Sequence, residues 1–280
     1  MLKIDYWNSL TKARSWLFVP GHRPDRFMKA KTSGADYVVL DLEDSVGPDR
    51  KSLARENIDR WLAADGTGVV RINGTGSPWH NDDLAMINGR CPVMLPKAER
   101  AENVAGVVDG LGSDPRVLVI LETALGIFNA REVCAVSGVI RAVFGNADLS
   151  TELGVDLGNH AALAHARSQV VLASAAAGVV PPIDGATAGL TDEEATSIDS
   201  SHALALGFTG KSCLHPRQVP VVNAAFSLSE DEIEWAKRIV AAAGDGSIGA
   251  MNSKIVGKPI FDRARRLLAR AGLGEQSQLG

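Results

Sequence analysis

Runs of apolar residues recur along the chain, and segments with helical periodicity separate them. Uninterrupted apolar runs of this length are typical of parallel strands covered on both faces, so they predict strands. The segments between them often end at a glycine, which is typical of a helix C-terminus. The eight predicted strands are residues 15–20, 37–44, 68–73, 92–98, 116–123, 141–148, 181–187 and 208–215. The predicted helices include residues 24–33, 51–63, 101–111, 128–137, 160–177 and 191–206.

This alternation predicts an α/β fold, with the eight strands closed into a (β/α)₈ TIM barrel. An open doubly wound sheet is the alternative, but eight units in a chain of 280 residues favour closure. The glycine-rich fingerprint of a dinucleotide-binding site is absent after the first predicted strand. We therefore expect a barrel domain over residues 1–222.

The pattern changes towards the C-terminus, where residues 223–280 predict a helical extension. Ser229 and Glu232 have the spacing of a capping box at the start of one helix, and a last helix is predicted over residues 259–271. The polar residues 274–280 predict a disordered tail. The extension has few apolar residues of its own, so we expect it to pack on the barrel or on a neighbouring subunit.

Composition and charge are those of an ordinary globular protein. Apolar residues make up 45% and charged residues 22%, and the net charge of −4 provides no general attraction to nucleic acid or to an anionic membrane. No apolar run is long enough to span a bilayer, and the N-terminus lacks the apolar core of a signal peptide. The three cysteines are far apart and odd in number, which predicts reduced thiols in a cytoplasmic protein.

Two acidic residues lie at the polar ends of two apolar runs, Glu122 in RVLVILET and Asp148 in RAVFGNAD. The C-terminal ends of parallel strands are where α/β folds place their chemistry. Two carboxylates there could hold a hard divalent cation such as Mg²⁺, which leaves positions open for substrate oxygens. Acids at strand ends also cap helices or pair with arginine, so the residues alone leave both interpretations open.

Further polar residues follow the other predicted strands and would line the same mouth of a barrel. Asp41, Glu43 and Asp44 close the second strand, although the stretch DLED is also compatible with a solvated loop paired with Arg50 and Lys51. These acids and the two described above could meet at one site, because parallel strands end at the same edge.

Basic residues also occur at the predicted mouth. Arg71 lies inside the apolar run VVRIN and needs an anionic partner, either a substrate carboxylate or a neighbouring acid. Lys97 follows the fourth strand. Arg23 and Lys29, after the first strand, could bind the phosphates of a large anionic ligand, or they could belong to a solvated helix face.

Taken together, these stretches resemble the citrate lyase beta-subunit-like branch of the HpcH/HpaI aldolase superfamily, which includes malyl-CoA and citramalyl-CoA lyases. The similar segments occur in order over residues 14–219. They are RSWLFVPGHRPDRFMKA, DYVVLDLEDSV, VVRING, VMLPKAE, ILETALGI, FGNADLSTELG and GKSCLHPRQV.

The resemblance implies an enzyme that uses Mg²⁺ to cleave or form a carbon–carbon bond in a 3-hydroxyacyl-CoA, with an acyl-CoA and a 2-keto acid as small-molecule partners. It implies that Glu122 and Asp148 are the metal ligands and that Arg71 grips the carboxylate of the keto acid. It also implies a homo-oligomer, a trimer or a multiple of one, in which Asp262 crosses into a neighbouring site as a catalytic acid. The remaining expected site residues are Glu43 and Asp44 as catalytic acids, and Lys97, Gly145 and Asn146 at the substrate.

Two other functions are compatible with the same residues. One is an aldolase that acts on free hydroxy-keto acids without CoA. The other is a non-catalytic subunit that binds a keto acid or CoA within a larger complex.

Overall fold

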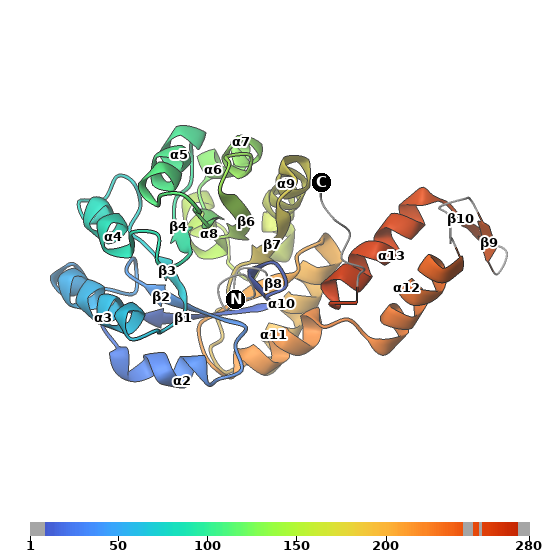
Figure 1. Ribbon diagram of the computed structural model, residues 1–280, viewed down its shortest axis with the longest axis horizontal. Helices are drawn as coiled ribbons and strands as arrows, with labels where there is room; N and C mark the ends of the chain where they lie inside the picture. Colours follow the sequence, from blue (N-terminus) through green and yellow to red (C-terminus); the bar gives the residue numbers. More distant parts are fainter. Residues whose placement is uncertain (1–8, 243–248, 252–253, 274–280) are drawn as a thin grey trace. The chain divides into compact units, whose positions relative to one another are not determined.

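Eight parallel strands form a closed barrel surrounded by helices (Figure 1). The computed structural model describes residues 9–242, 249–251 and 254–273 of the chain. The strands are β1 (Ser15–Pro20), β2 (Tyr37–Asp41), β3 (Val69–Arg71), β4 (Val93–Leu95), β5 (Val117–Leu121), β6 (Val139–Phe144), β7 (Val180–Asp184) and β8 (Gly210–Cys213). Because β1 pairs in parallel with both β2 and β8, the sheet is closed. The predicted TIM barrel is confirmed, and an open sheet is excluded.

Helices connect the strands and cover the outside of the barrel. They are α2 (Phe27–Lys31), α3 (Lys51–Ala63), α4 (His80–Ile87), α5 (Ala101–Gly110), α6 (Ala124–Phe128), α7 (Ala130–Cys134), α8 (Asn146–Leu153), α9 (His160–Ala177), α10 (Glu193–Leu206) and α11 (Gln218–Phe226). Two short 3₁₀ helices, Pro24–Arg26 and Pro48–Arg50, precede α2 and α3. The structure adds α4, α8 and α11 to the helices named above. The helix predicted over residues 128–137 is present as α7 but is shorter, Ala130–Cys134, and a separate helix, α6, ends at Phe128 just before it.

Several strands end earlier than the sequence pattern predicts. The strand predicted to reach residue 44 ends at Asp41, and the one predicted to reach residue 98 ends at Leu95. The sixth strand ends at Phe144, so Asp148 lies in the first turn of α8 and not in a strand. The apolar pattern overestimates these strands because polar residues of the following turn were counted with them.

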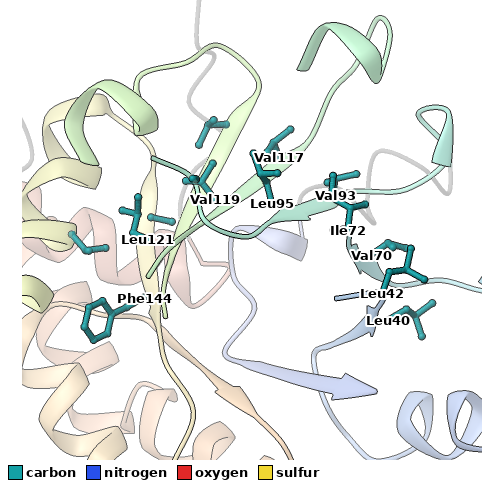
Figure 2. Packing of buried hydrophobic residues seen from close by; sticks show 14 of the residues in the cluster. Leu40, Leu42, Val70, Ile72, Val93, Leu95, Val117, Val119, Leu121 and Phe144 are labelled. Atoms are coloured by element: carbon teal, nitrogen blue, oxygen red, sulfur yellow. The ribbon is translucent and has the colours of Figure 1, made fainter. Parts of the chain in front are cut away.

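Strand side chains alternate between the barrel interior and the outer layer that faces the helices. The inner cluster includes Tyr37, Val39, Val69, Leu118 and Ile120. The outer layer, drawn in Figure 2, includes Leu40, Leu42, Val70, Val119 and Leu121. Because side chains two residues apart share a face, Asp41, Arg71 and Glu122 follow the inner set and point into the mouth of the barrel.

The acid at the end of β7 faces the other way. Ile183 belongs to the inner cluster, so Asp184 points towards the helices. Its buried carboxylate accepts hydrogen bonds from Arg167 Nε of α9 at 2.9 Å and from Lys211 Nζ of β8 at 3.0 Å. Asp184 therefore ties two strands to a helix and does not contribute to the mouth.

Residues 227–280 form a second compact unit, separate from residues 1–226. Its elements are α12 (Glu230–Ala242), α13 (Lys258–Arg270) and the antiparallel pair β9 (Gly249–Met251) and β10 (Lys254–Val256). The predicted capping box is confirmed, since Glu232 N–H donates to Ser229 Oγ and Ser229 N–H donates to Glu232 Oε2. The boundary predicted after residue 222 falls inside α11. Residues 274–280 lie outside the described residues, and the packing partner of this unit stays a prediction.

Cys91, Cys134 and Cys213 are free and buried, as predicted for reduced thiols. In the part of the chain that the structure describes, no helix has both the length and the apolar character needed to cross a membrane.

Candidate active site

Glu122 follows β5 directly and is 3% exposed. Its Oε1 accepts a hydrogen bond from the main-chain N–H of Lys97 at 2.8 Å. Burial and the neighbouring carboxylates of Glu43 and Asp148 raise the pKa of Glu122 well above its usual range. Because the charge of Asp148 contributes to that shift in pKa, the two carboxyl groups lie near each other. Such a pair favours the uptake of a cation or a proton.

The start of α8 brings Asp148 to Glu122. The main-chain N–H of Gly145 donates to Leu121 O at 3.0 Å, and α8 begins at the next residue. Gly145 lies so close to Glu122 that a Cβ there would be 2.2 Å from the Glu122 Cβ. Asn146 is buried and donates to Ala186 O at 2.9 Å, which ties this turn to the segment after β7. Glycine is therefore required where α8 starts against the acidic pair.

Arg71 binds the acids that follow β2. Its Nε and Nη2 donate to the two oxygens of Asp41 at 2.6 and 2.7 Å, and its Nη1 lies 2.9 Å from Glu43 Oε2. Burial would lower the pKa of Arg71, but the charge of Asp41, its hydrogen bonds and the charges of Glu43 and Glu122 together outweigh burial and raise that pKa. Of the two partners considered for Arg71, the structure shows neighbouring acids. A substrate carboxylate as a further partner stays a prediction.

The interpretation of DLED as a solvated loop is wrong for its first two acids. Asp41 is 1% and Glu43 is 5% exposed, because Arg71 contacts both carboxylates inside the mouth and the main-chain N–H groups of Glu43 and Ser45 donate to Asp41. Burial and the neighbouring charge of Asp44 together raise the pKa of Glu43 by more than Arg71 and Lys97 lower it. Asp44 does face solvent, with 60% of its side chain exposed.

Lys97 contacts three acids of the mouth. Its Nζ donates to Glu43 Oε1 and lies 3.9 Å from both Glu122 Oε1 and Asp44 Oδ2. Burial would lower the pKa of Lys97, but the hydrogen bond to Glu43 and the charges of Glu43, Glu122 and Asp44 together outweigh burial and raise that pKa. Lys97 is therefore a charged ammonium at the rim of the acidic mouth.

Lys51 is a residue of the site that the sequence interpretation missed, since it was considered only as a partner of a solvated loop. It is buried, and its Nζ donates to Leu42 O at 2.7 Å, to Glu43 O at 2.9 Å and to Asn73 Oδ1 at 2.7 Å. Asn73 in turn donates to Leu42 O at 3.0 Å. These bonds hold the turn that carries Glu43. Sequence offers no signal for this role, because a lysine at the start of a helix is usually exposed.

The charges of the mouth fit a divalent cation. Four carboxylates, those of Asp41, Glu43, Glu122 and Asp148, face two cations, Arg71 and Lys97. Further out, the exposed Asp44 and the buried Lys51 add one charge of each sign. The excess of two negative charges matches one Mg²⁺. Among the described residues, no three or more side chains of His, Cys, Asp or Glu are arranged so that together they could hold a metal ion. Mg²⁺ does not require this, because it favours a pair of carboxylates completed by water and substrate oxygens.

Two other predicted site residues, Arg23 and Lys29, make no contact with this cluster in the part of the chain that the structure describes, and a third, Asp262, is in the second unit. Arg23 donates two hydrogen bonds to Asp25, at 2.8 and 2.9 Å, and Lys29 is exposed on α2. Asp262 belongs to the second unit, where it pairs with Lys258 at 2.7 Å. Their roles at the site stay predictions.

Known proteins with similar sequences and structures share this architecture. Residues 14–216 match the HpcH/HpaI aldolase/citrate lyase family, and residues 188–273 match a family described as a C–C bond lyase of the TIM-barrel fold. A citrate lyase subunit beta-like protein of Mycobacterium tuberculosis is 36% identical over 268 residues, covering 92% of this chain and 95% of that protein. A (3S)-malyl-CoA thioesterase of Cereibacter sphaeroides is 33% identical, covering 92% of this chain and 94% of that protein.

A solved structure extends the similarity to a bound state. The crystal structure of protein CitE from Mycobacterium tuberculosis, in complex with magnesium, acetoacetate and coenzyme A, has a TM-score of 0.77 and 33% sequence identity. It covers 93% of this chain and 98% of that chain. Because the family match, the relatives and the fold all extend over most of its length, the protein belongs to the HpcH/HpaI aldolase/citrate lyase family and is a carbon–carbon lyase.

Proposed function

We propose that this chain is a Mg²⁺-dependent lyase that converts a 3-hydroxyacyl-CoA, such as malyl-, citramalyl- or citryl-CoA, into an acyl-CoA and a 2-keto acid, or catalyses the reverse reaction. The observation that carries this proposal is the buried Glu122 carboxyl, which faces Asp148 in a mouth with excess negative charge. The relative named for (3S)-malyl-CoA and the structure that holds magnesium and coenzyme A support the substrate class.

Glu122 and Asp148 are the proposed ligands of Mg²⁺. Bound there, Mg²⁺ supplies a Lewis acid for the hydroxyl and carboxylate oxygens of the substrate. Arg71 is the proposed group that orients the carboxylate of the keto acid. Its guanidinium is already held by two hydrogen bonds to Asp41, so binding the substrate does not have to order a flexible side chain. Gly145 and Asn146, at the start of α8, are proposed to line the substrate on the side of Asp148.

Cleavage in this chemistry requires one group that removes the proton of the 3-hydroxyl and another that delivers a proton to the α-carbon of the thioester. The proposed catalytic acids close to the 3-hydroxyl are Glu43 and Asp44. Glu43 contacts Arg71 and Lys97, and Asp44 lies beside Lys97. Asp262 is the proposed proton donor to the α-carbon. It would come from a neighbouring copy in a homo-oligomer, a trimer or a multiple of one.

Basic residues are proposed to bind the anionic parts of the substrate. Arg23 and Lys29 are exposed enough to meet the phosphates of CoA, and Arg23 would exchange its contact with Asp25 for a phosphate. Lys97 has 44% of its side chain exposed and would add positive charge near the substrate carboxylate.

The test is turnover of malyl-, citramalyl- and citryl-CoA by the purified protein with Mg²⁺, with acyl-CoA, keto acid and free CoA measured separately. We expect wild type to form an acyl-CoA and a keto acid in equal amounts from at least one thioester. Asp148→Asn should abolish turnover, while Asp109→Asn, a matched substitution of an exposed acid on α5, should leave it unchanged.

Other products would identify other functions. Free CoA without keto acid would indicate a thioesterase. Turnover of free hydroxy-keto acids that survives reversal of charge at Arg23 and Lys29 would indicate an aldolase that does not need CoA. Binding of acetyl-CoA or oxaloacetate without turnover, together with a stable partner protein, would indicate a non-catalytic subunit.

A further inference from the structure

Lys97 has a backbone conformation that is unusual for a lysine. Its φ is +50°, and the other described residues besides glycine with positive φ are Asp65 and Asn88. Asp and Asn tolerate this left-handed region, and Asn88 caps the end of α4. Lys97 is neither of these residue types, and it follows β4 at the mouth of the barrel. Strain of this kind persists only where the surrounding structure imposes it, and it is concentrated at functional sites.

The strained turn directs the main-chain N–H of Lys97 to Glu122 Oε1, at 2.8 Å. The preceding residue, Pro96, has no N–H to donate. The following N–H, that of Ala98, returns to the neighbouring strand and donates to Ile120 O at 3.1 Å. Lys97 is therefore the position at which the chain turns a main-chain donor away from the sheet and towards a side chain.

This hydrogen bond restricts the rotation of the Glu122 carboxylate. With Oε1 bound to the amide, Oε2 lies beside Gly145, where a Cβ would be 2.7 Å from it. Gly145 is the residue from which α8 begins, and the first turn of α8 carries Asp148. By binding Oε1, the main-chain N–H of Lys97 thus keeps Oε2 of Glu122 on the side where Asp148 lies.

The side chain of Lys97 makes different contacts. Its Nζ donates to Glu43 and lies 3.9 Å from Glu122 Oε1. An ammonium at that distance from a metal ligand repels a bound cation, because charges of the same sign raise the energy of both. The main chain and the side chain of Lys97 therefore have opposite effects on a metal at Glu122, and substitutions can separate them.

We propose that Lys97 is a positioning residue for Glu122, which acts through its left-handed backbone and main-chain N–H and not through its ammonium group. The inference rests on the proposed function in one respect, that Glu122 is a ligand of Mg²⁺.

The test compares Mg²⁺ affinity, measured by isothermal titration calorimetry, in wild type and in Lys97→Gly, Lys97→Ala and Lys97→Val. Thermal unfolding of each metal-free protein shows that it is folded. Glycine adopts positive φ freely, and alanine has the same Cβ as lysine, so both keep the amide in place and remove only the ammonium. We expect both to bind Mg²⁺ as tightly as wild type or more tightly.

Valine is β-branched and is excluded from the left-handed region, so the amide should turn away from Glu122. We expect its Mg²⁺ affinity to fall by roughly 10–100-fold, which is typical when a metal ligand loses an outer hydrogen-bond partner. A loss of about tenfold or more in the glycine or alanine variant would assign the effect to the side chain and overturn the proposal. So would wild-type affinity in a folded valine variant. If the valine variant does not fold, the glycine and alanine variants still decide, because weak Mg²⁺ binding by either one would assign the effect to the side chain, and wild-type affinity in both would exclude a role for the ammonium.

Glu122→Gln distinguishes failure of this proposal from failure of the proposed function. If Glu122 is a ligand, this variant should lose Mg²⁺ binding. Retention of wild-type Mg²⁺ affinity in Glu122→Gln would overturn both the metal site and the inference about Lys97. Loss of binding there, combined with weak binding by Lys97→Gly, would overturn the inference about Lys97 alone.

Discussion

Replacing Gly145 with alanine tests the geometry of the acidic pair most directly. A Cβ at this position would lie 2.2 Å from the Glu122 Cβ, 2.7 Å from Glu122 Oε2 and 3.0 Å from the Ile120 Cγ2. Carbon atoms in contact are separated by about 3.5–4.0 Å, so the closest of these contacts is too short by more than about 1 Å. Gly145 has a φ of −89°, which other residues adopt easily, so the substitution acts by collision and not by backbone strain.

The collision has to displace Glu122. Glu122 is buried and bonded to the amide of Lys97, so the Gly145→Ala variant can relieve the contact only by moving the carboxylate or the start of α8. Either movement, of roughly 1 Å, exceeds the tolerance of about 0.2 Å within which metal–ligand distances are held. We expect the Mg²⁺ affinity to fall by about 10–100-fold or more, which corresponds to about 1.4–2.8 kcal/mol.

Isothermal titration calorimetry with Mg²⁺ measures this loss, and circular dichroism shows whether the variant is folded. Gly106→Ala is the matched control, since a Cβ at this position in α5 has no atom within 4 Å. The control should bind Mg²⁺ like wild type and be no less stable, because alanine favours a helix over glycine. Wild-type affinity in a folded Gly145→Ala protein would refute the reasoning, because a displaced Glu122 could not then be a ligand.

Three further predictions concern stability and reactivity. Lys51→Met removes three buried hydrogen bonds, so urea denaturation should show a free energy of unfolding lower by about 2–4 kcal/mol; an unchanged value would mean that the Glu43 turn does not depend on them. Asp184→Asn leaves its two buried cationic partners without a counter-charge and should cost about 3–5 kcal/mol at neutral pH. Burial would raise the pKa of Asp184 in the folded state, but Lys211 and Arg167 together outweigh burial and lower that pKa. The ionised Asp184 therefore stabilises the fold fully above its unfolded pKa of 3.8, and this stabilisation is lost as the pH falls through the lower pKa of the folded state. The difference between wild type and Asp184→Asn, measured by urea denaturation, should therefore shrink from neutral pH to about pH 3, and a constant difference would contradict this account. Burial raises the pKa of each cysteine to about 12, so a thiol reagent at mildly alkaline pH should label none of the three in the folded protein and all three after denaturation.

The fold class was predictable because the local signals agree with each other. Apolar runs, helical segments and terminal glycines alternate through the first three-quarters of the chain, and a closed barrel satisfies all of them. The ends of elements were less predictable. Asp148 was assigned to a strand and lies in α8, because the turn at Gly145 depends on contact with Glu122, a residue far away in the sequence.

The candidate site was predictable in its residue types but not in its contacts. Acids at strand ends pointed to Glu122, and an arginine inside an apolar run pointed to a buried ion pair at Arg71. The reaction class came from the resemblance to a family, since the residues alone left a metal site and helix caps as alternatives. Lys51 could not be recognised, because its three acceptors lie on two different turns that meet only in the folded barrel.

The sequence by itself determined the order of the strands and helices and placed acids at the ends of several strands. Only the tertiary structure decided which way those acids face. In runs such as VLVIL every position is apolar, because both faces of a strand in a parallel barrel are buried, so no alternation of polar and apolar residues marks the inner face. Glu122 and Asp184 illustrate the two directions. Glu122 points into the barrel, where it lies near Asp148, and Asp184 points outward, where it bonds to Arg167 and Lys211. A shift of one residue along a strand exchanges these two outcomes, and only the packing of the barrel against its helices sets that register.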